Sequence, residues 1–536
     1  VEIAEIRQVE VVKGANSALF GFNAANGVIN IVTYSPLTDK INSASVTYGT
    51  QEVLSGAAVA TGQIGDKFGL RLSAGGLTGS DFQTALPAQS QKNRLDPKRQ
   101  SLKADARAKL GESAQAGLEL SHTRAKGSEL NPGYQFVGGD YTTWSAAGRA
   151  SAETQIGLIE AQLYHNAMEM DMLDRSGAGS TLNFKSAVTV FQLTDQFKIG
   201  TDHSFRPLFE FRRNAMDSTP VGGGEISYTV AGLGGMWDWQ LSDSVSWTNS
   251  VRGDYLSLAR SGALPSATGY TNSDWDQSSL ALSYNSGIVY KATDVDSFRL
   301  TAARAIQAPS LVELGLLSIS AATGQTPSLI LSGNPRIRPT VVNNYEAGYD
   351  RAFPEWGAKF RGSVFYQRTE DVKQISGETR FNRNAVVISS NNIGNSEALG
   401  FELGLQVKKP SGWRYGANYT YTRITDLYTA DSLQVNTEKG TPQHMIKANV
   451  GYSFDRWEID AYSRYISHIY QSAGNNAGSS LTRIPGYFET DLRVGYRLTD
   501  FLTLSLTGTS INLNRHAETS GPEVERRVFA TLTASF

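Results

Sequence analysis

The side chains that most often carry out enzymatic chemistry are few and scattered in this sequence. It contains no cysteine and six histidines, which are His122, His165, His203, His444, His468 and His516. A hydrolase needs a nucleophile and a base held within hydrogen-bond reach, and a catalytic metal needs clustered ligands such as an HxxxH pair. The histidines form no such pair and belong to no recognisable motif. The pattern argues against an enzyme and a catalytic metal site, and no cofactor is expected.

Arginine and aromatic residues indicate a different chemistry, the binding of an anion. The candidate ligand-binding residues are Arg94, Tyr134, Phe136, Tyr141, Arg336, Arg338, Arg380 and Phe381. They fall in four predicted loops, three of which cover about 79–98, 307–342 and 370–396. Charge-assisted hydrogen bonds and ring contacts together suit an anionic metal chelate. The same arginines could instead be solvated or bind lipopolysaccharide phosphates, and the rings could stack on sugars or hold a corrin ring.

The segments that must carry these loops repeat one pattern, an alternation of apolar and polar residues. In LKADARAKL, residues 102–110, the even positions are apolar and the odd positions are charged. The alternation recurs at 114–120, 401–407, 492–496 and 528–536. Period two places successive side chains on opposite faces of an extended strand. About 22 such strands can be placed between residue 43 and the last residue.

Three features favour a membrane barrel over a soluble β-sandwich. The predicted strands are long, about 11–14 residues, whereas sandwich strands are nearer five or six. Tight turns such as GES at 111–113 and KPSG at 409–412 alternate with much longer connections. Aromatic residues gather toward strand ends, as they do at membrane interfaces. We therefore predict an all-β membrane protein, an antiparallel transmembrane β-barrel of about 22 strands.

Composition excludes several other classes of protein. The chain has 49 basic and 51 acidic residues, so its near-zero net charge gives no electrostatic case for nucleic-acid binding. No run of 18 apolar residues occurs, so a transmembrane helix is not expected. No secretory signal is seen before Val1, although one could have been removed.

The stretch VEVVKGANSALFGFNAANGVINIVTYSP, residues 9–36, resembles the end of the plug domain of TonB-dependent outer-membrane receptors. The matching parts are VEVVKG, LFG and GVINI. Phe20 replaces the usual tyrosine, and Asn26 stands where a second glycine is common. By this resemblance residues 1–40 are the C-terminal part of a plug and residues 41–536 are the barrel. The TonB box and most of a plug are not in this sequence, and GVINIVTYSP is expected to be a buried strand.

Later segments resemble the same family in the same order. They are AARAIQAPSLVELG at 302–315, GNPRIRPTVVNNYEAGYD at 333–350, NIGNSEALGFELGL at 392–405, GTPQHMIKANVGYSF at 440–454 and the terminal Phe536. Ile337 and Thr340 depart from the leucine and glutamate that are common there. Each match alone is weak, but their order supports the family over nearly the whole chain.

The resemblance implies a transporter in the bacterial outer membrane. It would bind a scarce nutrient, with a ferric siderophore as the first choice, and take energy from the inner-membrane TonB–ExbB–ExbD complex. Lipopolysaccharide, outer-membrane lipid and a surface lipoprotein are further expected partners, and a monomer is expected. The alternative reading is a passive channel or a structural anchoring barrel with an incomplete plug.

Charged residues on the polar strand faces are candidates for contacts between plug and barrel lumen. They are Lys103, Asp105, Arg107, Glu402, Asp460, Arg464 and Arg493. The plug must be held firmly enough to seal the lumen and weakly enough to move. The same charges could simply solvate a pore wall.

Overall fold

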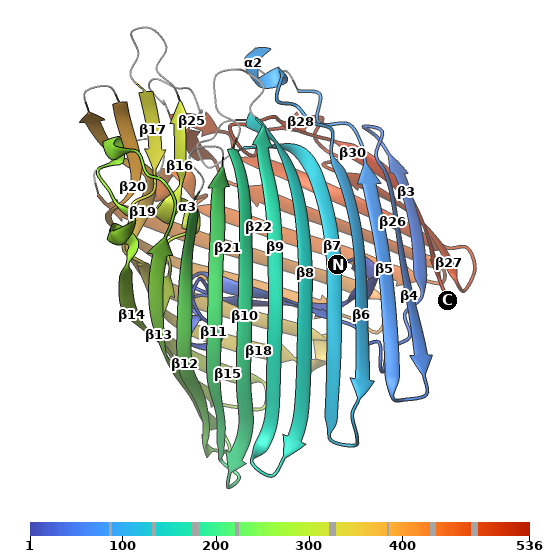
Figure 1. Cartoon of the computed structure of the whole chain (residues 1–536). Coiled ribbons are helices and arrows are strands. Elements are labelled where there is room, and N and C mark those ends of the chain that lie inside the picture. Colours follow the sequence, from blue (N-terminus) through green and yellow to red (C-terminus); the bar gives the residue numbers. More distant parts are fainter. Residues whose placement is uncertain are drawn as a thin grey trace.

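The structure, a computed structural model, describes residues 1–536 apart from 85–87, 131–135, 174–181, 220–223, 321–327, 383–384, 429–435 and 473–480. The described residues form a tall closed barrel with tight turns at one rim and longer connections at the other (Figure 1). The described residues contain no helix that is long and apolar enough to span a membrane.

Antiparallel strands make the wall of the barrel. The first half contains β3 (Ser43–Gly49), β4 (Leu54–Ile64), β5 (Phe68–Thr78), β6 (Lys98–Lys109), β7 (Ala114–Leu130), β8 (Phe136–Thr154), β9 (Gly157–Leu173), β10 (Leu182–Ile199), β11 (His203–Thr219), β12 (Glu225–Ser242) and β13 (Val245–Arg260). The second half contains β14 (Gln277–Lys291), β15 (Asp296–Gln307), β18 (Thr340–Phe353), β19 (Ala358–Asn382), β20 (Ala385–Lys408), β21 (Trp413–Leu427), β22 (His444–Phe454), β23 (Trp457–Ile466), β26 (Tyr487–Arg497), β27 (Leu502–Thr509) and β30 (Arg527–Ser535).

The predicted strand number is confirmed. The closed sheet of the described residues contains 24 strands, and two of them, β16 (Leu317–Ser320) and β17 (Ser328–Ser332), form a hairpin attached to the upper part of β20. The other 22 make the wall. β3 pairs with β30, which joins the first and last wall strands and leaves no open edge.

Short elements occupy the connections between wall strands. They are α2 (Ala88–Gln91), η2 (Ser266–Thr268), η3 (Asn272–Trp275), α3 (Leu311–Gly315), η4 (Pro354–Trp356), α4 (Thr437–Gly440), β24 (Ile469–Ser472), β25 (Leu481–Ile484), β28 (Arg515–His516) and β29 (Val524–Glu525). All but η4 lie in the longer connections rather than at the tight-turn rim.

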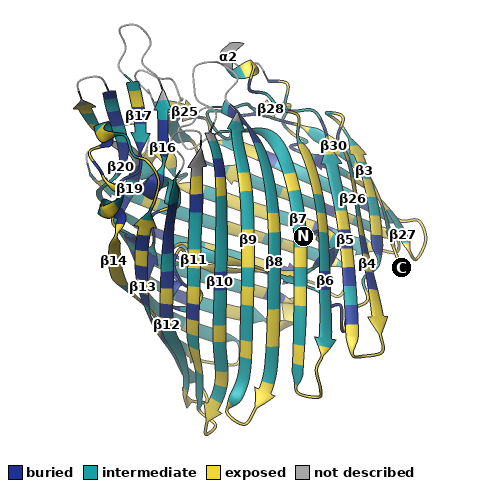
Figure 2. Cartoon of the chain, in the orientation of Figure 1, coloured by how far each residue is buried: buried dark blue, intermediate teal, exposed yellow. Residues whose placement is uncertain are grey.

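Alternation places apolar side chains outside and charged ones inside. On β6, Leu102 is strongly exposed on the outer surface while Asp105 is buried within the lumen. Figure 2 shows the resulting bands of exposed and less exposed residues along the strands. This is the pattern expected where a lipid-facing surface backs a polar lumen.

Residues 1–42, named the lumenal segment here, lie within the barrel (Figure 1). The segment contains η1 (Ile3–Glu5), β1 (Ile6–Lys13), α1 (Ser17–Phe20) and β2 (Gly27–Thr33), and β1 and β2 pair with each other. GVINIVT is a strand as expected, but the expectation that it is buried is wrong. Ile29 of β2 is 70% exposed, and among the described strands β1 and β2 pair only with each other.

Two predicted loops are wrong as well. Phe136 and Tyr141 lie in β8, which begins earlier than the sequence pattern indicated. The segment predicted as a loop at 370–396 is a long hairpin made by β19 and β20, so Arg380 and Phe381 are strand residues. In both places the backbone pairing between strands continues beyond the membrane-length part of the strand. Apolar and polar residues do not strictly alternate there, so the sequence pattern does not indicate a strand.

Candidate functional site

Three extracellular segments fold together above β12 and β13. They are the β13–β14 connection, the β15–β18 connection and the upper part of the β19–β20 hairpin. Nε1 of Trp275 donates a hydrogen bond of 2.8 Å to the Leu314 carbonyl, and the Tyr270 hydroxyl lies 3.3 Å from Oδ1 of Asn334. Nδ2 of Asn334 donates to the Ser390 carbonyl at 2.9 Å. These bonds fix the loops to each other.

Three arginines contact two aromatic rings in this assembly. We name Tyr270, Trp275, Arg260, Arg336 and Arg380 the Tyr270 cluster. The guanidinium carbon of Arg380 lies 4.9 Å from the centroid of the Tyr270 ring, and that of Arg336 lies 5.8 Å from it. Arg260 lies 5.3 Å from the ring of Trp275. Tyr270 is only 8% exposed and Trp275 only 1%. Cation–π attraction is stronger where the ring is desolvated.

One carboxylate adjoins the cluster. The backbone N–H and the hydroxyl of Thr271 donate to Oδ2 of Asp274 at 2.8 and 3.0 Å. These hydrogen bonds hold the pKa of Asp274 below its usual value, and the charge of Arg336 adds to the effect. Asp274 therefore stays ionised and offsets part of the positive charge of the Tyr270 cluster.

The structure brings together Arg336 and Arg380 of the predicted ligand-binding residues. Arg338, from the same connection, makes a salt bridge of 2.5 Å with Asp371 instead. Phe381 is 83% exposed, and no contact between it and the rings of the Tyr270 cluster is seen among the described residues.

The remaining candidates lie elsewhere at the same rim. A nitrogen of Arg94 donates to the Thr84 carbonyl at 2.6 Å, and the Phe136 carbonyl accepts from Asn93 at 2.8 Å. The Tyr141 hydroxyl is hydrogen-bonded to Glu129. Tyr134 lies outside the described residues.

The lumenal segment is anchored to the wall at Glu5. Its carboxylate lies 3.4 Å from Nε of Arg71 on β5 and 3.5 Å from Nζ of Lys103 on β6. Arg71 also donates to Asp105 at 2.9 Å and to the Tyr34 carbonyl. Burial alone would raise the pKa of Glu5, but the hydrogen bonding and the two nearby cations outweigh it and lower that pKa.

A second anchor lies on the opposite side of the lumen, where α1 meets β12–β15. The Ser17 hydroxyl lies 3.3 Å from the carbonyl oxygen of Ile306 and 3.2 Å from its nitrogen. Gly21 follows with φ +82°, and a Cβ there would lie 3.2 Å from a guanidinium nitrogen of Arg252. Glycine is therefore required both for the backbone angle and for the close approach.

Phe22 of the lumenal segment joins the hydrophobic core of the extracellular assembly. This core includes Tyr270, Trp275, Leu314 and Ile337 together with residues of β12 and β13. The two rings of the Tyr270 cluster and Phe22 of the lumenal segment thus belong to one hydrophobic core.

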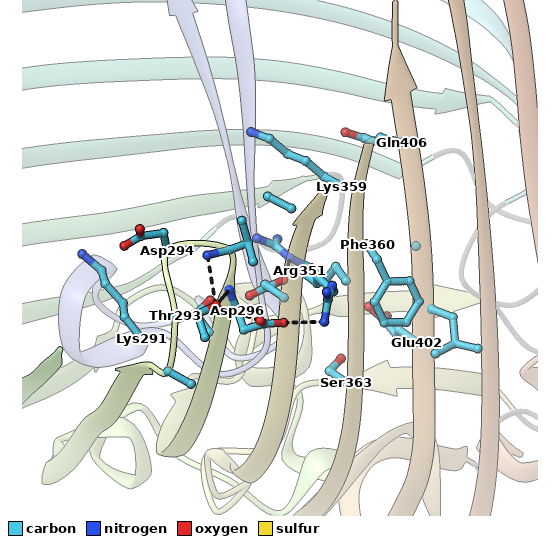
Figure 3. A pocket seen from close by; sticks show the side chains of 18 of the residues that line it. Lys291, Thr293, Asp294, Asp296, Arg351, Lys359, Phe360, Ser363, Glu402 and Gln406 are labelled. Atoms are coloured by element: carbon cyan, nitrogen blue, oxygen red, sulfur yellow. Dashed lines mark hydrogen bonds and ion pairs between the residues drawn. The ribbon is translucent and has the colours of Figure 1, made fainter. Parts of the chain in front are cut away.

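A third contact is made by Lys13 at the end of β1, whose ammonium lies 2.5 Å from Glu402 on β20. It borders a cavity of about 1090 Å³ near the tight-turn rim (Figure 3). The cavity walls carry both signs of charge, with Arg351 paired to Asp296 at 3.2 Å. The mixed charges give a polar, hydrated space rather than a site for one sign of ligand.

The other predicted lumen residues make ion pairs with wall residues or, for Arg464, also with a residue of the connection after β27. Arg107 lies 3.2 Å from Asp105, and Asp460 lies 2.6 Å from Arg414. Arg493 lies 2.7 Å from Glu458. Arg464 pairs with Glu518 at 2.5 Å and also with Glu489.

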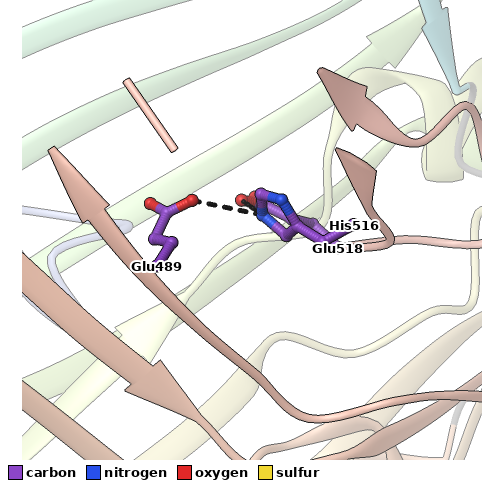
Figure 4. A group of neighbouring side chains, drawn as sticks. All are labelled: Glu489, His516 and Glu518. Atoms are coloured by element: carbon purple, nitrogen blue, oxygen red, sulfur yellow. Dashed lines mark hydrogen bonds and ion pairs between the residues drawn. The ribbon is translucent and has the colours of Figure 1, made fainter. Parts of the chain in front are cut away.

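Glu489 and Glu518 also flank His516 (Figure 4). Its Nε2 lies 3.2 Å from Glu489 and 3.0 Å from Glu518. Three such ligand atoms could in principle hold a cation, but the guanidinium of Arg464 already contacts both carboxylates. The group is best described as an ion-pair network that fastens the connection after β27 to the wall.

Sequence reasoning missed Glu5, Arg71, Arg252 and Tyr270. The arginines occupy lumen-facing positions of alternating strands, where many charges look alike. The burial of Tyr270 depends on loop packing, which period-two patterning does not encode. Its position among Gly, Thr and Asn residues was typical of a solvent-exposed turn.

A closed barrel of 22 strands, with long loops at one rim and an internal segment fixed to the wall, is the architecture of a plugged outer-membrane receptor. The chain belongs to the TonB-dependent receptor-like β-barrel family, whose model matches residues 42–513. Membership places the protein in the bacterial outer membrane, among transport receptors rather than enzymes.

Solved structures with the same fold include three iron-related receptors. The FrpB iron transporter from Neisseria meningitidis has a TM-score of 0.80 at 15% identity, with 100% of this chain and 89% of that chain covered. The ferric-catecholate import receptor Fiu from E. coli has a TM-score of 0.77 at 16% identity, over 99% and 86% of the two chains. A mutant of the ferric enterobactin receptor PfeA from Pseudomonas aeruginosa has a TM-score of 0.78 at 16% identity, over 100% and 86%. No protein of curated function matches the sequence.

Proposed function

We propose that the protein imports a ferric siderophore or a similar anionic metal chelate, and that the Tyr270 cluster contributes to binding it. The observation that carries this proposal is the convergence of Arg336 and Arg380 on one buried ring. Guanidinium groups held by a ring are preorganised, so less side-chain entropy is lost when they bind an anion. The named cargoes of the Fiu and PfeA receptors, ferric catecholate and ferric enterobactin, are of this class.

We further propose that residues 1–40 are the C-terminal part of a plug and that residues 41–536 form the barrel around it. The TonB–ExbB–ExbD complex would supply the energy for release by acting on the plug. Lipopolysaccharide and lipid surround the barrel, and a surface lipoprotein remains an additional partner to be sought. The three separate contacts at Glu5, Ser17 and Lys13 support this division, since each joins the lumenal segment to a different part of the wall.

Binding tests the proposal directly. The full protein would be titrated with ferric catecholate and ferric hydroxamate siderophores while its tryptophan fluorescence is followed. We expect Arg336→Ala with Arg380→Ala to weaken binding of the preferred siderophore by roughly 10- to 100-fold, the size expected for two charge-assisted contacts. Arg338→Ala is the matched control, because it removes one charge from the same connection but outside the Tyr270 cluster.

Equal affinity in the double variant and the wild type would remove the cluster from the ligand site. Absence of any siderophore binding, together with steady ion conductance in planar bilayers without TonB, would favour a passive channel. Uptake of radiolabelled iron in cells with and without TonB completes the comparison, because active import requires TonB and passive flow does not.

A further inference from the structure

The outer wall has a hollow on β13, β14 and β15 where short side chains face the bilayer. Asn285 faces the lumen, since its Nδ2 donates to the Ala15 carbonyl of the lumenal segment at 2.6 Å. Arg252 is fully buried against the same segment. Because side chains alternate along a strand, Ser286 and Asn249 face outward.

The pairing register aligns these short residues in one row. Trp237 pairs with Asn249, Asn249 with Ser286, Ser286 with Ala302, and Ala302 with Tyr345. Strands lie about 4.8 Å apart, so two large rings flank a gap of roughly 19 Å in which only short side chains project. Two hollows of about 560 and 480 Å³ lie along this gap, and Ser286 borders both.

Most of the polar groups in the hollow are bonded to one another, and Nδ2 of Asn249 is the exception because it has no hydrogen-bond partner among the described residues. Nε1 of Trp247 donates to the Ser286 hydroxyl at 3.0 Å, and that hydroxyl donates to Oδ1 of Asn249 at 2.8 Å. The other lining groups include Val251, Ile288 and Leu300, which are apolar. A surface of this kind suits hydrocarbon and offers little to a headgroup.

The position of the hollow identifies the leaflet. Trp237, Trp239 and Trp247 pack with ring centroids 5.4 to 6.2 Å apart, beside the tight turn that joins β12 to β13. Tryptophan clusters mark the membrane–water interface. The tight turns lie at the rim opposite the long loops, so this interface is the periplasmic one, where glycerophospholipids form the leaflet.

We propose that this hollow is a binding site for one acyl chain of a periplasmic-leaflet glycerophospholipid. The chain lies across Ser286 and Ala302, and the tryptophan cluster holds the glycerol end at the interface. The occupant is a chain rather than a second copy of the protein, because Trp237 and Tyr345 project on either side and a convex barrel would meet these rings before reaching the floor.

Native mass spectrometry tests the site on the full protein. The protein would be stripped of lipid and titrated with one synthetic phospholipid, palmitoyl-oleoyl phosphatidylethanolamine. We expect one phospholipid to remain bound at a collisional activation that removes all others. Ala302→Phe, which fills the hollow, should reduce the fraction of protein that keeps this phospholipid roughly tenfold. Ala58→Phe is the matched control, because Ala58 is an exposed alanine on the outer face of β4, away from the hollow.

Equal retention in wild type, Ala302→Phe and Ala58→Phe would overturn the proposal and leave only unspecific surrounding lipid. A lipid-free dimer that Ala302→Phe dissociates would also overturn it, in favour of a second copy. Heat-modifiable migration on gels confirms folding of each barrel, and Ala302→Leu replaces Ala302→Phe if the larger side chain prevents folding.

Discussion

The carboxylate of Glu5 lies 3.4 Å from the guanidinium of Arg71, and neither side chain exposes any surface. Lys103 and Asp105 complete a network in which charges from the lumenal segment and from two wall strands alternate. A buried charge without its partner is strongly unfavourable. The first turn of the lumenal segment is therefore fixed to the wall by electrostatics, whereas its apolar ribbon is exposed.

Replacing Glu5 should loosen this end of the segment. We expect Glu5→Gln to destabilise the docked state of the lumenal segment by about 2 kcal/mol, because Arg71 and Lys103 each lose one of their carboxylate partners and keep only Asp105 and Glu119. Hydrogen exchange of the segment in detergent-solubilised protein measures the change. The exposed carboxylate of Glu10 on β1 provides the control, Glu10→Gln, which we expect to change the exchange free energy by less than about 0.5 kcal/mol.

The same anchor should respond to acid. The pKa of Glu5 is lowered in the folded protein, so its contribution is fully present above the unfolded value near 4.3 and is lost as pH falls through the folded value. Exchange protection of residues 3–6 should therefore be constant near neutral pH and decrease only in strongly acidic solution. In Glu5→Gln this acid dependence should be weaker; an unchanged profile would assign it to another carboxylate.

The aromatic ring of Tyr270 should contribute more to siderophore binding than its hydroxyl group does. Tyr270→Leu removes the surface on which Arg336 and Arg380 lie, and we expect siderophore affinity to fall by roughly three- to thirtyfold, the range of one or two cation–π contacts. Tyr270→Phe retains the ring and loses only the long contact to Asn334. It should bind within about threefold of wild type. If both variants bind alike, the ring does not position the arginines.

The ion pair between Lys13 and Glu402 should contribute little to the free energy that holds β1 against the wall. Its side chains are 66% and 30% exposed, and exposed ion pairs are worth about 0–1 kcal/mol. A double-mutant cycle of Lys13→Ala and Glu402→Ala, read by hydrogen exchange of β1, should give a coupling free energy in this range that shrinks with added salt. A coupling above about 2 kcal/mol would show that this contact holds the ribbon in place.

The barrel could be predicted from sequence because its rule is local. A residue such as Leu102 must face lipid if Lys103 faces water, and this two-residue constraint repeats along every wall strand. Turn lengths then identified the two rims. The rule no longer applies above the membrane, where both faces of a strand meet water or protein. The sequence pattern therefore predicts loops where β8, β19 and β20 extend.

The candidate site was predictable only in part. Arg336 and Arg380 were chosen because they are arginines in predicted loops, and the structure places both on Tyr270. Their meeting point depends on how three connections pack, which no alternation describes. The same limit applies to Arg464, which was expected to face a plug but pairs with Glu518 from a later connection.

The seam between β3 and β30 has a consequence for the order of assembly. Ser43 pairs with Ser535, so the last contact that closes the wall joins residues from opposite ends of the barrel sequence. Such a distant pairing has a high loop-closure entropy and cannot form until nearly the whole barrel sequence is available. Closure therefore waits until the last wall strand is available, and the unclosed sheet must be protected from aggregation until then.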